Sequence, residues 1–265
     1  MMNRINKISY KVLVLLMGAA VLLACNKKKL VDAPYPEAAV YLSQAAQAKY
    51  NMGGLYTVPA NIYNQPVYYT IENGKLNIPV GVIRTGADLS GDVEVKLKAE
   101  GKDSTLFSSL PANSFSIVNA VNVKSGNINA SVPLSIDLNF LINSFKNNPE
   151  AKYGLLVSID AAGRPLTANL ASVILVITPE ILLKPVSDFF AYTYNDGSMT
   201  GYFVNKAING FSYSWDFGDG SALVNEASPA PHSYKAKGTY KIKLTVKGAD
   251  DNIPLSVKET ELIIM

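Results

Sequence analysis

The most informative segment of the chain is Tyr213-Ser214-Trp215-Asp216-Phe217-Gly218-Asp219-Gly220-Ser221. Its aromatic residues, with Phe211 just before them, alternate with Ser212, Ser214 and Asp216. A period of two is what a half-buried β-strand requires, and Gly-Asp-Gly is a turn signal. We therefore predict a strand that ends at this turn and carries its aromatic side chains on one apolar face.

The same stretch places two carboxylates and two glycines in the turn. Gly218 and Gly220 permit positive φ, and the carboxylates of Asp216 and Asp219 can accept hydrogen bonds from nearby backbone N–H groups. Calcium also binds clustered carboxylates, but it needs six or more oxygen ligands, and the neighbourhood adds only Ser221 and backbone carbonyls. A turn-stabilising role is therefore favoured over a calcium site, and no metal is expected.

The residues around this stretch resemble the PKD domain, an immunoglobulin-like β-sandwich. The resemblance rests on Trp215–Ser221 and on the segments Pro185–Phe189, Pro231–Tyr234, Gly238–Tyr240 and Tyr240–Val246. It covers residues 181–265 and implies a structural role for a set of signature residues: Trp215, Asp216, Phe217, Gly218, Asp219, Gly220, His232, Tyr234, Gly238 and Tyr240. The residues themselves agree, since the lone Trp215 would bury a large area between two sheets.

Two strands are expected to complete this C-terminal sandwich. From Tyr240 to Lys247 apolar residues at even positions alternate with Lys241, Lys243, Thr245 and Lys247, which is the pattern of a strand with one wet face. The segment 256–264 supplies a closing strand.

The N-terminus has the features of a secretory signal. A basic region with Arg4, Lys7 and Lys11 precedes the apolar run 12–23, which is too short for a membrane span. The run ends in Leu22-Leu23-Ala24-Cys25, which resembles the bacterial lipobox. We expect residues 1–24 to be removed and the Cys25 thiol to carry the lipid.

Removal of this segment changes the charge balance. The chain has 24 Lys and Arg residues against 21 Asp and Glu, and the signal contains three of the basic residues and no acid. The mature chain is therefore formally neutral, which argues against a nucleic-acid partner. Cys25 is the only cysteine, so no intramolecular disulfide can form.

A short tether, residues 25–35, is expected after the lipid. It contains Lys27-Lys28-Lys29 and no apolar period. Asn26, next to the lipidated cysteine, resembles the residue found in lipoproteins that are sent to the outer membrane. We expect an outer-membrane lipoprotein, with the cell surface favoured over the periplasmic face.

Residues 36–180 are predicted to form an N-terminal β-sandwich. Short alternating segments are separated by Gly, Asn or Pro: 78–83, with Pro79 interpreted as an edge-strand residue, then 93–98, 115–118, 132–136, 155–159 and 171–177, the last placed centrally. One interruption is helical, because Leu138, Leu141, Ile142 and Phe145 share a face and Asp137 can cap its start. We expect this helix to cover one open end of the sandwich.

This segment resembles the N-terminal domain of uncharacterised function in many Bacteroidetes surface lipoproteins. The resemblance rests on Val40-Tyr41-Leu42, Pro79-Val80, the helix after Ile136-Asp137-Leu138, and the segment 153–159. In that family a variable C-terminal module follows, such as a lectin-like or glycoside hydrolase domain.

Tyrosines are dense between residues 35 and 69, and Tyr56, Tyr63, Tyr68 and Tyr69 are candidates for stacking on sugar rings. The alternative is that they simply half-bury in sheets, which tyrosine favours. The sequence favours half-burial over a sugar-stacking platform.

Nothing in the sequence nominates catalysis. His232 is the only histidine and belongs to the PKD-like pattern, which leaves no second histidine for a zinc site. No phosphate-binding loop or dinucleotide fingerprint occurs, so neither an enzyme nor a cofactor is expected. The leading hypothesis is a lipid-anchored protein that binds extracellular glycan for polysaccharide capture. The alternative is an adhesion or structural protein that contacts host or envelope proteins.

Overall fold

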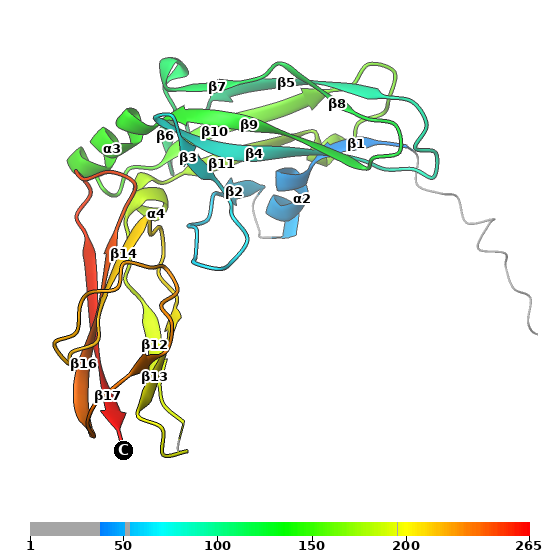
Figure 1. Cartoon of the computed structure of the whole chain (residues 1–265). Helices are drawn as coiled ribbons and strands as arrows, with labels where there is room; N and C mark the ends of the chain where they lie inside the picture. The colour runs from blue at the N-terminus through cyan, green and yellow to red at the C-terminus, as the bar shows by residue number, and fades with distance from the viewer. Residues whose placement is uncertain (1–37, 51–53, 195) are drawn as a thin grey trace, which may run out of the picture. The chain divides into compact units, whose positions relative to one another are not determined.

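The computed structural model describes residues 38–50, 54–194 and 196–265. Within them the chain forms two β-sandwiches, each around its own hydrophobic core (Figure 1). The predicted fold class, all-β with two tandem sandwiches, is confirmed. Cys25, the segment 1–24 and the tether 25–35 lie outside the described residues.

The N-terminal sandwich contains eleven strands and three α-helices among the described residues. The strands are β1 (Val40–Leu42), β2 (Leu55–Thr57), β3 (Thr70–Glu72), β4 (Lys75–Arg84), β5 (Val93–Gly101), β6 (Ser108–Ser109), β7 (Phe115–Ile117), β8 (Ala120–Val123), β9 (Asn129–Asp137), β10 (Tyr153–Asp160) and β11 (Ser172–Ile177). The helices are α2 (Ser43–Tyr50), α3 (Leu138–Asn147) and α4 (Pro179–Leu183), with 3₁₀ turns at Ala112–Ser114 and Ala168–Leu170.

These strands make two sheets. One has the order β1-β4-β9-β7, with β3 paired to β4, and the other has the order β2-β11-β10-β5-β8, with β6 paired to β10. Strand β11 lies between β2 and β10, so the prediction that it is not at an edge is confirmed. Its second face can be apolar because helix α2 packs against it.

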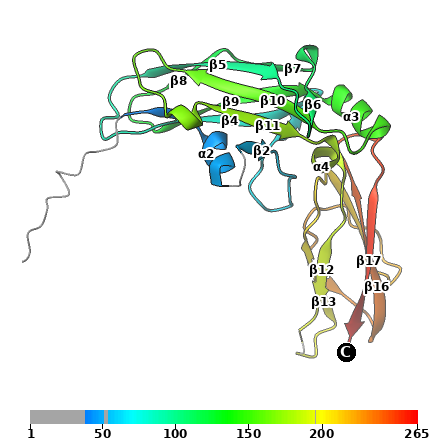
Figure 2. The same cartoon turned by 180° about the vertical axis from the view of Figure 1, so that it is seen from behind.

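Helix α3 follows the sequence pattern closely. Leu138, Leu141, Ile142 and Phe145 are buried in the first core, and the Asp137 carboxylate accepts a hydrogen bond from the Phe140 N–H at 2.9 Å. Such an N-cap satisfies one of the free N–H groups of the first turn. The helix lies at one end of the sandwich in both views, as expected (Figures 1 and 2).

The prediction that Pro79 lies on an edge strand is wrong. Strand β4 pairs with both β1 and β9, and Pro79 lies opposite Pro133 of β9. The side-chain amide of Gln44 occupies the place beyond the end of β1: its Nε2 donates to the Pro79 carbonyl, and its Oε1 accepts from the Gly81 N–H. The nitrogen of Pro79, which has no hydrogen to donate, therefore faces the Gln44 side, where no neighbouring strand would accept a hydrogen bond from it.

The C-terminal sandwich has two three-stranded sheets. Their strands are β12 (Phe189–Tyr192), β13 (Thr200–Asn205), β14 (Ser212–Asp216), β15 (His232–Ser233), β16 (Gly238–Lys247) and β17 (Ser256–Ile264). The sheet orders are β12-β13-β15 and β14-β16-β17. The expected strands from Tyr240 and from Ser256 are both present, with the apolar side chains of β16 turned into the core.

One of the alternating aromatic residues departs from the expected face. Trp215 and Phe217 are buried and Tyr213 is half-buried, but Phe211 is 53% exposed. Strand β14 begins at Ser212, so Phe211 lies in the turn before it, where strand alternation does not apply. Its N–H donates to the Lys247 carbonyl at 2.8 Å.

Candidate functional site

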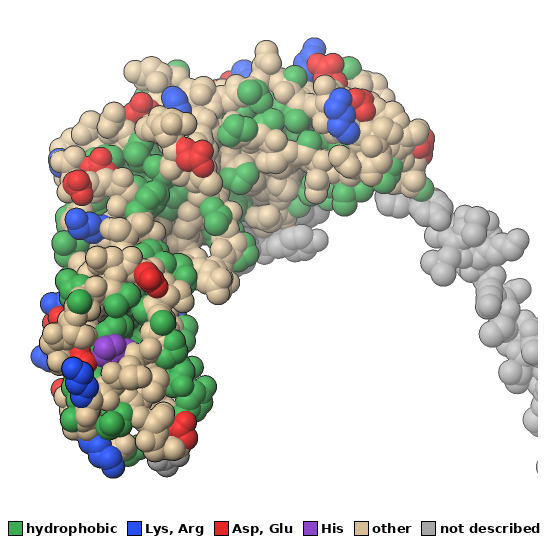
Figure 3. Space-filling view, in the orientation of Figure 1, with side chains coloured by type: hydrophobic (Ala, Val, Ile, Leu, Met, Phe, Trp, Pro, Cys, Tyr) green, Lys and Arg blue, Asp and Glu red, His purple; other side chains and the backbone are tan. Residues whose placement is uncertain are grey.

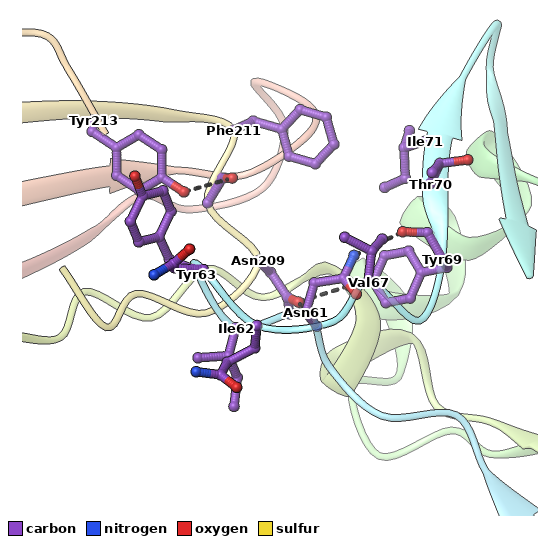
Figure 4. Close-up of a pocket in the computed structure, with 13 residues that line it drawn as sticks. Asn61, Ile62, Tyr63, Val67, Tyr69, Thr70, Ile71, Asn209, Phe211 and Tyr213 are labelled. Atoms are coloured by element: carbon purple, nitrogen blue, oxygen red, sulfur yellow. Dashed lines mark hydrogen bonds between the residues drawn. The ribbon is translucent and has the colours of Figure 1, made fainter. Parts of the chain in front are cut away.

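A pocket of about 410 Å³ is the candidate site (Figure 4). We call it the junction pocket, because one wall comes from residues 61–71 of the N-terminal sandwich and the other from residues 209–213, which lead into β14. Its size lies in the usual range for small-ligand sites.

A network of side-chain amides builds the base of the junction pocket. The Oδ1 of Asn209 accepts from the Asn61 N–H at 3.1 Å, and its Nδ2 donates to the carbonyls of Ile181 and Lys184. The single proton of the Tyr69 hydroxyl is shared between Asn209 Oδ1, at 2.7 Å, and the Leu182 carbonyl, at 2.5 Å. Asn209 has φ of +53°, in the left-handed region that asparagine tolerates better than most residues. The two walls of the pocket are thus held through one saturated amide.

Asn61 extends this network. Its Nδ2 donates to the Tyr69 carbonyl and its Oδ1 accepts from the Tyr68 N–H, each at 2.8 Å. These bonds close the loop between Asn61 and Tyr69 on itself. Burial raises the pKa of Tyr69, so its hydroxyl stays protonated and able to donate.

Aromatic rings form the sides of the pocket. The rings of Tyr63 and Tyr213 meet edge to face with centroids 5.8 Å apart, and the Tyr213 hydroxyl donates to the Gly210 carbonyl at 3.0 Å. Figure 4 shows Tyr63 and Tyr213 together, with the exposed ring of Phe211 nearer to Ile71. Burial, and then the neighbouring Tyr63, raise the pKa of Tyr213.

None of the residues lining the junction pocket carries a formal charge at neutral pH. The Asn209 amide is already used by its own hydrogen bonds, so the polar groups that the lining offers a ligand are the amides of Asn61, Asn64 and Gln65, together with hydroxyls. Such a lining gives no ion pair to an acidic or basic ligand. It suits a neutral molecule that presents both hydroxyl groups and C–H faces.

The four tyrosines nominated from the sequence do not form one platform. Tyr56 and Tyr69 are buried in the first core, and only Tyr63 and Tyr69 line the junction pocket. Tyr68 is 37% exposed and lies outside the lining. The sequence analysis missed Asn61, Asn209 and Phe211, although the Asn209-Gly210 pair is a recognisable turn signal.

The PKD-like signature residues come together inside and beside the second core. Trp215 is buried and its Nε1 donates to the Glu226 carbonyl at 2.9 Å, while Phe217 stacks on the His232 ring with centroids 4.2 Å apart. The Tyr234 ring meets those of His232 and Tyr240, with centroids 4.8 and 4.2 Å away. Gly238 begins β16.

The turn carboxylates are occupied by the turn itself. Asp216 accepts from the Gly218 N–H and Asp219 from the Ser221 N–H, and the second oxygen of Asp219 lies 2.8 Å from His232 Nε2. Burial alone would raise the pKa of Asp219, but the hydrogen bonds with Ser221 and His232 outweigh it and lower the pKa to about 2. Across the part of the chain that is described, no group of three or more His, Cys, Asp or Glu is arranged to hold a metal.

Comparison with known proteins identifies one module. A sequence model of the PKD domain matches residues 191–261. A stretch of 45 residues is 47% identical to human polycystin-1, covering 15% of this chain and 1% of that protein. The chain therefore spans only a small fraction of the length of the curated relative it matches.

Three solved structures from Bacteroides ovatus resemble this chain, each with a low TM-score and low sequence identity. A protein of unknown function has a TM-score of 0.33 at 14% identity, covering 78% of this chain and 67% of the other. A putative carbohydrate binding protein has a TM-score of 0.37 at 9% identity, covering 80% and 64%. A multidomain protein including DUF1735 has a TM-score of 0.31 at 11% identity, covering 76% and 59%. All three TM-scores are below 0.5.

Among the described helices, none has the length and apolar character needed to span a membrane.

Proposed function

We propose that this protein is a non-catalytic component of the cell envelope that binds neutral glycan in the junction pocket. It would be lipidated at Cys25, anchored in the outer membrane and directed to the cell surface, as part of a polysaccharide-capture system. The observation that carries the proposal is the lining of the pocket, which combines aromatic rings with amides and lacks formal charge. Sugars present apolar C–H faces to rings and hydroxyl groups to amides.

The test is affinity electrophoresis of the protein in native gels containing dextran, yeast mannan, laminarin, xylan or the acidic polygalacturonate. Retardation by at least one neutral polysaccharide, and none by polygalacturonate, is expected. Replacing Tyr63 or Phe211 by Ala removes one ring from the lining and should weaken binding about 2- to 10-fold. Tyr68→Ala is the matched control, because it removes a nearby exposed ring that is not part of the pocket.

Three outcomes would count against the proposal. Unaltered mobility of the wild-type protein in all neutral gels would leave it without a ligand of the proposed class. Equal weakening by Tyr63→Ala and Tyr68→Ala would place binding elsewhere. Capture of envelope or host proteins without any response to polysaccharide would favour the adhesion role instead.

A further inference from the structure

A second group of aromatic side chains lies on the outer face of the C-terminal sandwich. It comprises Phe190 and Tyr192 of β12, Tyr194 just beyond, and Tyr202 and Val204 of β13, and we call it the aromatic face. The pairs Phe190–Val204 and Tyr192–Tyr202 are directly opposite in the register. In Figure 3 hydrophobic side chains gather along the right-hand edge of the lower part, where Figure 1 draws β12 and β13.

Strand alternation explains why these rings point outward. Phe189 and Phe203 turn into the second core and are buried, whereas Phe190 is 56% exposed and Tyr194 53% exposed. The side chains of the adjacent residues Phe189 and Phe190, at the start of β12, therefore lie on opposite faces of the sheet. The outward rings are not needed for the core.

The rings hold one another in place. Phe190, Tyr192 and Tyr202 form a row in which neighbouring ring planes are tilted by 26° and 18°, with centroids 5.8 and 5.3 Å apart. Tyr194 stands across the row, with its centroid 5.5 Å from that of Tyr192 and 4.9 Å from that of Tyr202. Such packing fixes the side chains before any ligand arrives, which lowers the entropy lost on binding.

The outer face of the opposite sheet shows what such a surface ordinarily carries. There Lys241 and Lys243 of β16 lie opposite Glu261 and Glu259 of β17. A sheet that meets only water has polar residues of this kind on its outer face. The exposed apolar residues of that opposite face, Val257 and Ile263, are aliphatic and carry no ring. The aromatic face differs because it groups four rings in mutual contact, and a cluster of exposed rings is typical of an interaction site.

The composition and size of the aromatic face favour a sugar. Its five side chains carry no charge, so they suit an electrically neutral ligand, and its three tyrosines add hydroxyl groups beside the rings. Stable protein interfaces use roughly 20–30 residues from each partner. A patch of five side chains is much smaller than that and comparable to a short run of sugar rings.

We propose that the aromatic face is a second binding site for neutral saccharide, located entirely on the C-terminal sandwich. The site goes beyond the junction pocket and does not depend on it, since the two share no residue. A chain with two such sites would hold a long polysaccharide more tightly than either site alone.

The test uses the double variant Phe190→Ala/Tyr194→Ala of the whole protein in native gels with dextran, mannan, laminarin, xylan and polygalacturonate. Both side chains are more than half exposed, so the fold should survive, and circular dichroism checks this. Ile263→Ala is the matched control, because Ile263 is 59% exposed on β17 of the opposite sheet. We expect about fivefold or greater weakening with a neutral polysaccharide for the double variant, and wild-type behaviour for the control.

The other outcomes distinguish the aromatic face from the junction pocket, and saccharide binding from a protein contact. Wild-type retardation of the double variant, with weakening in Tyr63→Ala, would overturn the aromatic face and leave the junction pocket in place. Weakening only in the double variant would support the aromatic face and overturn the pocket. Sedimentation velocity distinguishes a protein contact: loss of self-association in the double variant, with retardation unchanged, would overturn the saccharide proposal.

Discussion

Replacing Trp215 by Ala should unfold the C-terminal sandwich and leave the N-terminal one intact. The Trp215 ring is fully buried, with the centroids of Phe189 and Phe203 at 5.2 and 5.9 Å. Loss of so large a buried side chain costs about 3 to 5 kcal/mol. The Glu226 carbonyl also loses its donor, but Glu226 is exposed and water can replace that bond, so this loss adds at most about 1 kcal/mol.

The stability of a domain is about 5 to 15 kcal/mol, and a small sandwich of this kind belongs at the lower end of that range, which this cost matches. The two cores are separate, so the damage should stay in the second one. Hydrogen exchange measured by mass spectrometry follows each core through its own peptides. Exchange should rise strongly in β16, within Gly238–Lys247, and stay at the wild-type level in β4, within Lys75–Arg84.

Trp215→Phe is the graded control, because it keeps a ring in the core and should raise exchange in β16 less than Trp215→Ala does. Circular dichroism should show partial loss of β signal for the alanine variant only. If Trp215→Ala raised exchange equally in β16 and β4, the two cores would unfold as one unit. Wild-type exchange in β16 would show that Trp215 is not the centre of that core.

Four further results are expected. Gly218 and Gly220 both have positive φ, so replacing either by Ala introduces left-handed strain of about 1 to 2 kcal/mol. A Cβ at Gly218 would also lie 2.5 Å from the Lys241 carbonyl oxygen, so Gly218→Ala should lower the free energy of unfolding, measured in urea, by more than Gly220→Ala does. Equal losses for the two variants would contradict this. The lowered pKa of Asp219, about 2 against an ordinary 3.8, gives stability that is present above pH 4 and lost as the pH falls towards 2. Asp219→Asn should therefore flatten the dependence of the urea midpoint on pH in that window, and an unchanged slope would argue against the turn role. Asn209→Gly keeps the left-handed backbone but removes the three hydrogen bonds with Asn61, Ile181 and Lys184, while the Tyr69 hydroxyl can still donate to the Leu182 carbonyl. It should therefore lower stability by about 2 to 4 kcal/mol and weaken retardation in the affinity gels. Cys25→Ser should move the protein from the membrane fraction to the soluble fraction on ultracentrifugation, and continued sedimentation with membranes would contradict lipidation.

Local patterns made much of the fold predictable from the sequence. The spacing of Leu138, Leu141, Ile142 and Phe145 is that of one helix face, and the alternation in β16 is that of a one-sided strand. Both patterns depend only on residues close together in the sequence, and the helix and the strand form where the patterns predict them. Pro79 was misplaced because the partner that makes it tolerable, Gln44, lies on a helix 35 residues away.

The candidate sites depend on contacts that sequence patterns do not reveal. Asn61 and Asn209 meet across 148 residues, and nothing local indicates that the backbone N–H of Asn61 donates to the side-chain oxygen of Asn209. In the adjacent pair Phe189-Phe190, either ring could have faced the core, so the sequence alone does not identify the aromatic face. Only the strand register decides which ring is exposed.

Calorimetric titration measures directly whether the junction pocket binds neutral sugar. The neutral polysaccharide that most retards the wild-type protein is titrated into the wild-type protein, Tyr63→Ala and Tyr68→Ala. The account predicts a Kd about 2- to 10-fold weaker for Tyr63→Ala than for the wild-type protein, and an unchanged Kd for Tyr68→Ala. Equal Kd values for all three proteins, with the variants folded, would contradict it.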